Sequence, residues 1–407
     1  MTNPRIKPLA GIRVVDLSRI VAGPYCTQQM ADLGAEVIKV EPPGGDDTRR
    51  FGPPFLGDDA TYYFSINRGK RSIAINLKTE AGKNIIYDLV RDADVVVENF
   101  RPGAAKRLGI DAQTLREIKP SLICVSISGY GAKGTEPWTT MPGYDLIIQG
   151  AGGIPSLTGP VDGDPYKIAG SWADIIASLN AFGGVMAALL HREKTGEGAS
   201  LDISMFDGQL AALMYHGTSW LNHRKAPRRH GNAHASICPY ETFEVSDGFI
   251  NIACGNDGQF DKLSGALAMP ELAEDARFSK NAQRVANREA LLARMIPVLS
   301  QEGVNHWLQV LGDAGVPCGP VASVPEALSH EQVEAREMIV EAQHPVYGSV
   351  QLVNNATGFS GAQDSSAPPL FSEHSREILR DVLKYDTIKV DELIRDGAVL
   401  EGSHDES

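Results

Sequence analysis

The chain has 407 residues, of which 43% are hydrophobic and 22% are charged, and these proportions exclude disordered, collagen-like and fibrous proteins. At roughly 150 residues per domain, the length predicts two or three domains, or one large α/β unit with an addition. Lys and Arg number 38 against 51 Asp and Glu, so the net charge of −13 argues against general nucleic-acid binding, and any phosphate needs a local basic pocket.

The compartment is predicted from the N-terminus and the cysteines. Residues 1–9 contain Pro and basic residues but no apolar core of a signal peptide, which predicts a cytoplasmic protein. The five cysteines are scattered and form no C-x-x-C pair, which argues against a disulfide framework and against a structural zinc site. We therefore expect a reducing environment.

The first 130 residues alternate short β-rich runs with helical patterns, which is typical of a parallel sheet with crossover helices. The predicted strands are 12–17, 36–41, 95–99 and 122–127, and the predicted helices are 26–33 and 79–91. In such sheets, binding sites lie beyond the carboxyl ends of the strands. The segments that follow the strands are 18–24, 42–50, 99–103 and 128–134, each rich in Gly, Pro or charge.

The middle and the end of the chain change in character. Residues 141–170 are rich in Gly and Pro, and a loop this long usually has a binding role. The apolar stretch 175–190 is shorter than the roughly 20 residues that a membrane span needs, so we predict a buried helix over 174–191 and no membrane partner. The further predictions are a strand at 200–204, a helix at 208–221, a charged linker at 223–230, strands at 241–245 and 249–253, and amphipathic helices within 373–396.

The common catalytic motifs are absent from the sequence. Neither G-x-x-x-x-G-K-[ST], H-E-x-x-H nor G-x-S-x-G occurs. The residues alone therefore indicate an acidic α/β protein with a Gly- and Pro-rich loop before Asp174.

Many short motifs, in order along nearly the whole chain, resemble the family III CoA-transferases (CaiB/BaiF family), which include formyl-CoA transferase and succinyl-CoA:dicarboxylate CoA-transferases. They begin with L-A-G-I-R-V-V-D-L-S-R-I-V-A-G-P and include D-V-V-V-E-N-F-R-P-G and A-G-S-W-A-D. The matching segments are 9–24, 33–49, 67–78, 94–103, 143–145, 169–174, 192–198, 231–240, 315–321 and 368–374.

The resemblance implies an α/β fold with a Rossmann-like open parallel sheet in a large domain, a smaller α+β domain, and an interlocked homodimer. Residues 1–205 would form the N-terminal part of the large CoA-binding domain and 206–235 a linker. Residues 236–330 would form the small domain, and 331–407 a return linker with C-terminal helices that complete the large domain.

The resemblance also implies a reaction. The family's nucleophilic aspartate falls on Asp174, which would pass CoA from an acyl-CoA such as succinyl-CoA to a carboxylic acid through an aspartyl anhydride and an aspartyl-CoA thioester. This exchange needs neither ATP nor a metal, and CoA is a substrate rather than a permanently bound cofactor. Contacts with CoA are implied at Val21, Ala22, Ile75, Lys78, Asn99, Phe100, Arg101, Arg107, Tyr144 and Asp145.

Two departures concern the substrate. Formyl-CoA transferase has a glycine-rich loop where this chain has N-A-H-A-S-I (232–237), which argues against oxalate. Phe51 stands where that enzyme has a substrate-side tryptophan, and Val21 where it has a glutamine. His234, Ser236 and Arg49 or Arg50 are therefore predicted to hold the distal carboxylate of a dicarboxylic acid.

Two other functions remain open. The α-methylacyl-CoA racemase branch shares broad similarity, but it has G-H-D where this chain has G-Y-D (143–145), and a tyrosine with a reference pKa near 10 is a poor base at neutral pH. A CoA-binding protein without catalysis is the other alternative, which the intact Asp174 argues against.

Overall fold

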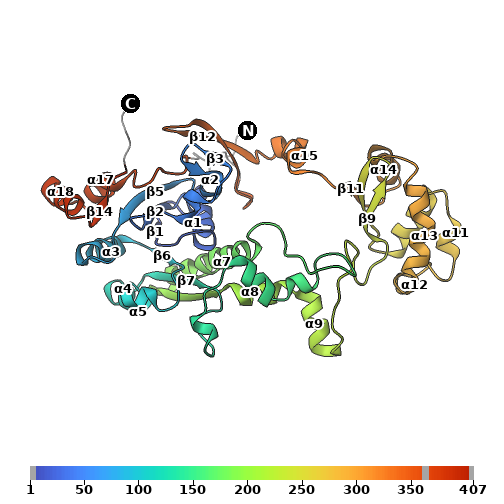
Figure 1. Cartoon of the computed structure of the whole chain (residues 1–407), viewed down its shortest axis with the longest axis horizontal. Coiled ribbons are helices and arrows are strands. Elements are labelled where there is room, and N and C mark those ends of the chain that lie inside the picture. Colours follow the sequence, from blue (N-terminus) through green and yellow to red (C-terminus); the bar gives the residue numbers. More distant parts are fainter. Residues whose placement is uncertain (1–5, 360–365, 403–407) are drawn as a thin grey trace. The chain divides into compact units, whose positions relative to one another are not determined.

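The computed structural model describes residues 6–359 and 366–402, so residues 1–5 of the N-terminal segment lie outside it. The chain forms two compact units (Figure 1). The large unit comprises Met1–Gly153, Ala169–Thr218 and Gln332–Ser407, and the small unit comprises Ile154–Ile168 and Ser219–Glu331. Each unit is therefore built from segments that are separate in the sequence.

The large unit is organised around a sheet that has seven strands within the described residues, in the order β14-β5-β2-β1-β6-β7-β8. All neighbouring strands are parallel except β14, which pairs antiparallel with β5. Numbered along the chain, the parallel strands have the doubly wound order 3-2-1-4-5-6, which confirms the predicted open parallel sheet. The strands are β1 (Arg13–Asp16), β2 (Glu36–Glu41), β5 (Lys70–Ile75), β6 (Val95–Glu98), β7 (Ile123–Ser128), β8 (Ala199–Ser204) and β14 (Val399–Leu400).

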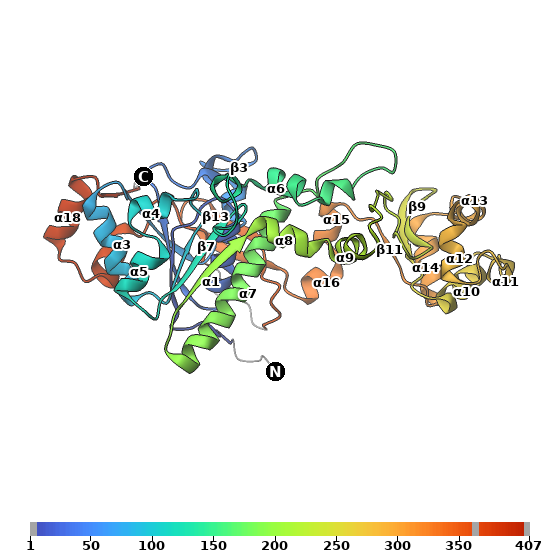
Figure 2. The same cartoon turned by 90° about the horizontal axis from the view of Figure 1, so that it is seen from below.

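Helices cover both faces of this sheet because its strands bury alternate residues on opposite sides. Val14 belongs to a core shared with α1 (Ala22–Asp32) and α7 (Trp172–Thr195), and α7 lies beside α1 (Figure 2). Its neighbour Val15 belongs to the opposite core, shared with α3 (Glu80–Asp92) and the C-terminal helices.

The remaining elements of the large unit surround the sheet. They are η1 (Asp47–Arg50), β3 (Phe55–Leu56), β4 (Asp59–Ala60), α2 (Thr61–Phe64), α4 (Ala104–Leu108), α5 (Ala112–Ile118), η2 (Trp138–Thr140), α6 (Asp145–Ala151), α8 (Met205–Ala212), the hairpin β12 (Ile339–His344) and β13 (Gly348–Val353), α17 (Ser375–Glu377), η4 (Ile378–Val382) and α18 (Thr387–Arg395). Helices α9 (Met214–His223) and α16 (Glu331–Ala335) cross the boundary between the units.

The small unit has its own hydrophobic core beneath a sheet of order β11-β10-β9. The structure confirms the strand pair predicted at 241–245 and 249–253, and helices follow these strands as predicted. The elements are η3 (Ile154–Ser156), β9 (Tyr240–Val245), β10 (Gly248–Ala253), α10 (Asp257–Ala266), α11 (Glu271–Glu274), α12 (Asn281–Ala286), α13 (Arg288–Leu299), α14 (Val304–Asp313), β11 (Cys318–Pro320) and α15 (Val324–Leu328).

Helix α7 is longer than the sequence predicts. It has 24 residues, and its most apolar part has a mean hydropathy of 1.6, so by length and composition alone it is able to cross a membrane. The sequence argument that the stretch 175–190 is too short to span a membrane is therefore wrong. Ala177, Ala181 and Val185 bury one face in the core of the sheet, whereas Leu179 and Leu190 on the other side are exposed. The buried face fixes the helix in the fold.

The helix predicted over 208–221 is also different, because it is two helices, α8 and α9. Met214, the first residue of α9, has φ of 44°, a left-handed conformation that interrupts a right-handed helix. In the predicted linker at 223–230, Arg229 donates hydrogen bonds to the carbonyls of Pro160 and Gly163, so this segment is tied to the small unit.

Candidate active site

A pocket that is open to solvent lies at the carboxyl edge of the large sheet. Its walls come from the segments that follow β1, β6 and β7, and the strand order reverses between β1 and β6, which is where doubly wound folds bind ligands. The lining residues are Arg19, Ile20, Ala22, Asn99, Phe100, Arg101, Pro102, Ile127, Ser128, Gly129, Pro142, Gly143, Tyr144, Asp145, Asp174 and Met205.

The segments after β1 and β6 are joined by Asn99. The Arg19 N–H donates to Asn99 Oδ1 at 2.9 Å, and Asn99 Nδ2 donates to the Arg19 carbonyl at 2.7 Å. The Arg19 guanidinium lies 3.3 Å from Asp47. Asn99 thereby fixes the backbone of the opposite wall of the pocket.

Asp174 lies in the first turn of α7, and the start of this helix is capped by another helix. Ser171 at the N-cap makes no capping hydrogen bond with its side chain. Instead Asp145, the first residue of α6, accepts the Ala173 N–H on Oδ1 at 2.8 Å and a hydrogen bond from Gln149 Nε2 on Oδ2 at 2.9 Å. A carboxylate beside the positive end of a helix is stabilising, so Asp145 fixes the turn that carries Asp174.

The carboxyl of Asp174 has an unusual proton affinity. Burial, and secondly the negative charge of Asp145, raise the pKa of Asp174 to about 7. Such a carboxyl is ionised in about half of the molecules at neutral pH and is weakly solvated, which suits a nucleophile or a general base.

The ring of Tyr62 lies close to this carboxyl. Its hydroxyl and Ser171 Oγ are 2.7 Å apart, and burial, with the charges of Asp174 and Asp145, raises the pKa of Tyr62. Phe51 packs edge to face on Tyr62, with 5.7 Å between the ring centroids.

Two glycines bring the backbone of the pocket together. A Cβ on Gly143 would lie 2.2 Å from Gly129 Cα, and a Cβ on Gly129 would lie 2.5 Å from Gly143 Cα. Only glycine at both positions allows the segment before α6 to lie against the end of β7. This approach places Tyr144 and Asp145 at the pocket.

Most of the predicted CoA contacts lie together. Ala22, Asn99, Phe100, Arg101, Tyr144 and Asp145 line the pocket with Asp174. The other four do not line it: Val21 and Ile75 are buried, whereas Lys78 after β5 and Arg107 on α4 are exposed. Within the described residues, no group of three or more His, Cys, Asp or Glu is arranged to hold a metal ion.

The predicted substrate residues are distributed over both units. Arg49 is buried in the large unit, where its guanidinium donates to Glu41, Asp59, Tyr63 and the Pro369 carbonyl. In the small unit, the Ser236 N–H donates to Nδ1 of His234 at 3.1 Å. Arg288 donates to the carbonyls of His234 and Ile237 and fixes this loop.

Three of the segments that the sequence indicates as binding segments, 18–24, 99–103 and 128–134, contribute to the pocket. Within them, Arg19, Ile20, Ser128 and Gly129 were not predicted individually as contacts of CoA. Tyr62 gave no signal, because its place beside Ser171 depends on a contact across 109 residues of sequence.

The chain is similar to several known proteins along most of its length. The sequence profile of CoA-transferase family III matches residues 9–375. A succinyl-CoA:glutarate CoA-transferase of Homo sapiens is 39% identical over 397 residues, which cover 97% of this chain and 90% of that protein. An acetyl-CoA:oxalate CoA-transferase of Acetobacter aceti is 43% identical over 364 residues, covering 89% of this chain and 92% of that protein. The crystal structure of a CAIB/BAIF family protein from Brucella suis has a TM-score of 0.82 and 43% identity, covering 92% and 99% of the two chains.

Proposed function

The chain belongs to CoA-transferase family III and is a CoA-transferase, and from that premise we propose that it transfers CoA from succinyl-CoA to a dicarboxylic acid, with Asp174 as the nucleophile. The observation that carries this proposal is the place of Asp174, a half-buried carboxyl with a pKa of about 7, in a pocket at the switch point of the sheet. The succinyl donor and the dicarboxylic acceptor rest on the named relatives.

The proposed reaction has four steps. The ionised Asp174 attacks the thioester carbonyl, the C–S bond breaks, and an aspartyl–acyl anhydride and the CoA thiolate form. The thiolate attacks the aspartyl carbonyl, which gives an aspartyl-CoA thioester and releases the donor acid. The acceptor carboxylate attacks this thioester and forms a second anhydride, and the thiolate then attacks the acceptor carbonyl of that anhydride. The products are the new acyl-CoA and free Asp174, so no net proton or metal is consumed.

We propose that CoA lies along the pocket with its diphosphate at Arg101 and its phosphoadenosine toward Lys78 and Arg107. Arg101 has no carboxylate partner within the described residues and is exposed, so its guanidinium is available to an anion. Phe100 offers an apolar surface to the pantetheine arm. Local cations are required because the whole chain carries a charge of −13.

For the acceptor, we propose that His234 and Ser236 contact the distal carboxylate, supported by the fixed loop around them. Arg49 already donates to two carboxylates, so we assign it a structural role in this proposal. His234→Ala is expected to raise the KM for the acceptor at least about fivefold with little change in the KM for acyl-CoA. An unchanged acceptor KM would remove His234 from the site.

We also propose that the enzyme is an interlocked homodimer. Large apolar side chains are exposed along α7 to α9, among them Leu179, Leu190, Leu210, Met214 and Tyr215, and such side chains are expected at subunit interfaces. Sedimentation over a dilution series tests this, since a folded monomer at micromolar concentration contradicts it.

The central experiment incubates the purified protein with succinyl-CoA and a panel of acids that includes glutarate and oxalate, and detects new acyl-CoA esters by mass spectrometry. Asp174→Ala and Asp174→Asn accompany it. We expect transfer to glutarate or a related dicarboxylate and a loss of at least about 10⁴-fold in both variants. Transfer that survives in both variants overturns the role of Asp174. Silence across the panel, with deuterium exchange into a 2-methylacyl-CoA, supports a racemase instead.

A further inference from the structure

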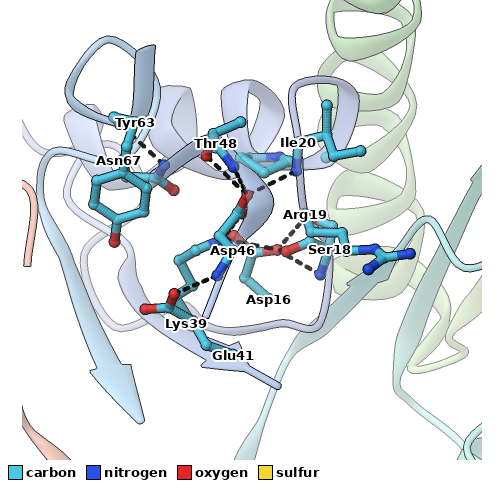
Figure 3. Close-up of polar contacts among 12 residues, drawn as sticks. Asp16, Ser18, Arg19, Ile20, Lys39, Glu41, Asp46, Thr48, Tyr63 and Asn67 are labelled. Carbon is cyan, nitrogen blue, oxygen red and sulfur yellow. Dashed lines mark hydrogen bonds and ion pairs between the residues drawn. The ribbon is translucent and has the colours of Figure 1, made fainter. Parts of the chain in front are cut away.

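The pocket loop formed by residues 18–21 rests on charged side chains that are buried beneath it. Asp16, Lys39, Glu41, Asp46 and Lys70 are each at most 3% exposed. Figure 3 shows Asp16, Lys39 and Glu41 around Asp46. Removing five charged side chains from water costs free energy, and only pairing with opposite charges and hydrogen bonds offsets this cost. The arrangement of these side chains therefore requires an explanation.

Asp46 is the centre of this cluster. Lys39 Nζ lies 2.7 Å from Asp46 Oδ2, and the same ammonium donates to the Ser18 carbonyl at 3.2 Å. Asp46 also accepts from the N–H and the hydroxyl of Thr48 on Oδ1. Burial raises the pKa of Asp46, but Lys39 and these hydrogen bonds outweigh it and hold the pKa at about 2. Asp46 therefore stays ionised throughout the working range of pH.

The loop above has a strained backbone. Ile20 has φ of 67°, and a β-branched residue is rarely left-handed because its Cβ crowds the backbone. The Ile20 N–H donates to Asp46 Oδ1 at 3.2 Å. Asp16 accepts the Ser18 N–H at 3.0 Å, and Asn99 binds both backbone groups of Arg19. The loop is thus held at three successive residues by side chains from three parts of the sheet.

We propose that Asp46 is a positioning residue for substrate binding: it keeps Ile20 in the left-handed conformation, and so holds residues 18–21 in the shape that receives acyl-CoA. Asp46 does not line the pocket, so it acts only through the loop. This inference rests on the proposed function, because it takes the ligand of the pocket to be CoA.

The test measures CoA binding by calorimetry, together with KM and kcat for acyl-CoA, in Asp46→Ala and Asp46→Asn. Asparagine keeps an oxygen for the N–H groups of Ile20 and Thr48 but removes the ion-pair partner of the Lys39 ammonium. We expect Asp46→Ala to weaken CoA binding about tenfold or more, with kcat at saturation changed less than about twofold, and Asp46→Asn to lie between it and the wild type.

The strain supplies a second, independent test. Glycine adopts φ near 67° without steric cost, so Ile20→Gly removes the conformational penalty that Asp46 offsets. In the Ile20→Gly background, Asp46→Ala is expected to weaken CoA binding less than about threefold relative to Ile20→Gly alone. An equal loss in both backgrounds shows that Asp46 does not act through the conformation of Ile20, and it overturns the proposal.

The matched control is the pair of Arg68 and Asp32. It is equally short, at 2.6 Å, and nearly as buried, with both side chains 4% exposed, but neither residue lines the pocket. Asp32→Ala is expected to lower the melting temperature as Asp46→Ala does and to leave CoA affinity within about twofold of the wild type.

The outcomes separate the two proposals. A folded Asp46→Ala protein with wild-type affinity for CoA, or an equal loss in Asp32→Ala, overturns the role of Asp46 while the transferase stands. If the wild type binds no CoA, the function proposed for the pocket fails and this inference fails with it.

Discussion

At the scale of single residues, Asp145 acts on Asp174 in two ways. Its carboxylate caps the first turn of α7 through Ala173, and its charge contributes to the raised pKa of Asp174. In our proposal Asp174 is the nucleophile and has to be ionised, so a pKa of about 7 means that about one tenth of the free enzyme is active at pH 6.

Asp145→Asn separates these effects, because the amide keeps an oxygen for the Ala173 N–H and loses the charge. With the like charge removed, the pKa of Asp174 falls, so the rising limb of kcat/KM against pH moves to lower pH. At pH 6 the variant is expected to retain a several-fold larger share of its own plateau rate than the wild type does. A full pH profile of both proteins checks this, and a rising limb that stays in place contradicts it.

Sequence alone predicted this site in part. Asp174, Asn99, Phe100 and Arg101 were identified through the resemblance, since each lies within a motif, and the structure brings all four into one pocket. The capping role of Asp145 was not predictable, because its partner amide is 28 residues away and belongs to another helix.

At the scale of elements, the contact between Gly129 and Gly143 controls where α6 begins. In Gly143→Ala, the new Cβ meets the backbone of the β7 end, so Tyr144 and Asp145 have to shift. A displacement of about 1 Å at a reacting centre costs about 10²-fold in rate, and we expect a loss of that order in kcat/KM. Gly150→Ala on α6 is the control, since nothing lies within 4 Å of its Cβ, and it is expected to retain full activity. Comparable losses in both variants contradict this account.

The β12–β13 hairpin makes stability depend on pH through His344. This buried ring accepts the N–H groups of Val346 and Tyr347 on Nδ1 and stacks on Tyr347, with 4.4 Å between centroids. Burial, with a smaller effect of Arg49, lowers the pKa of His344 below 6.5 despite the nearby Glu373.

Below pH 6.5 the unfolded chain therefore takes up a proton at His344 before the folded protein does, and stability is lost as the pH falls from 6.5 toward the folded pKa. We expect the free energy of unfolding of the wild type to fall more than that of His344→Gln between pH 7.5 and about pH 5. Urea denaturation of both proteins at each pH measures this difference. If the free energy of unfolding falls equally in both proteins, His344 is not the source of the pH dependence.

The elements missed from the sequence have physical reasons. Strand β5 begins with Lys70 and Arg71, and charges at the start of a strand obscure the apolar pattern, although Lys70 is buried against Asp16 at 3.1 Å. The hairpin was predictable, because Val340, Ala342 and His344 alternate with exposed residues along β12. By contrast, β2 was predicted to the residue because Val37, Ile38 and Val40 lie between Glu36 and Glu41.

At the scale of the whole molecule, each unit has its own hydrophobic core. We therefore expect two transitions in calorimetry. CoA binds only the folded large unit in our proposal, so CoA at 100 times its Kd is expected to stabilise that unit by about 2.7 kcal/mol and leave the other transition in place. A single transition that moves as a whole contradicts this expectation.

The parallel character of the large sheet was predictable from the alternation of strands and helices. The order of the strands was not predictable from the sequence, and neither was the assignment of Ile154–Ile168 to the small unit before α7 returns to the large unit. Both features depend on contacts between segments that are distant in the sequence.

The place of β14 has a consequence for biosynthesis. Val399 and Leu400 pair with Ile75 and Ala74, so the outer edge of β5 is covered by residues that are translated more than 300 positions later. At roughly 5–20 residues per second, that edge stays unpaired for tens of seconds while the ribosome adds the residues between β5 and β14. An unpaired strand edge is a template for association with other nascent chains, so the emerging N-terminal half is the stage at which a chaperone would be needed.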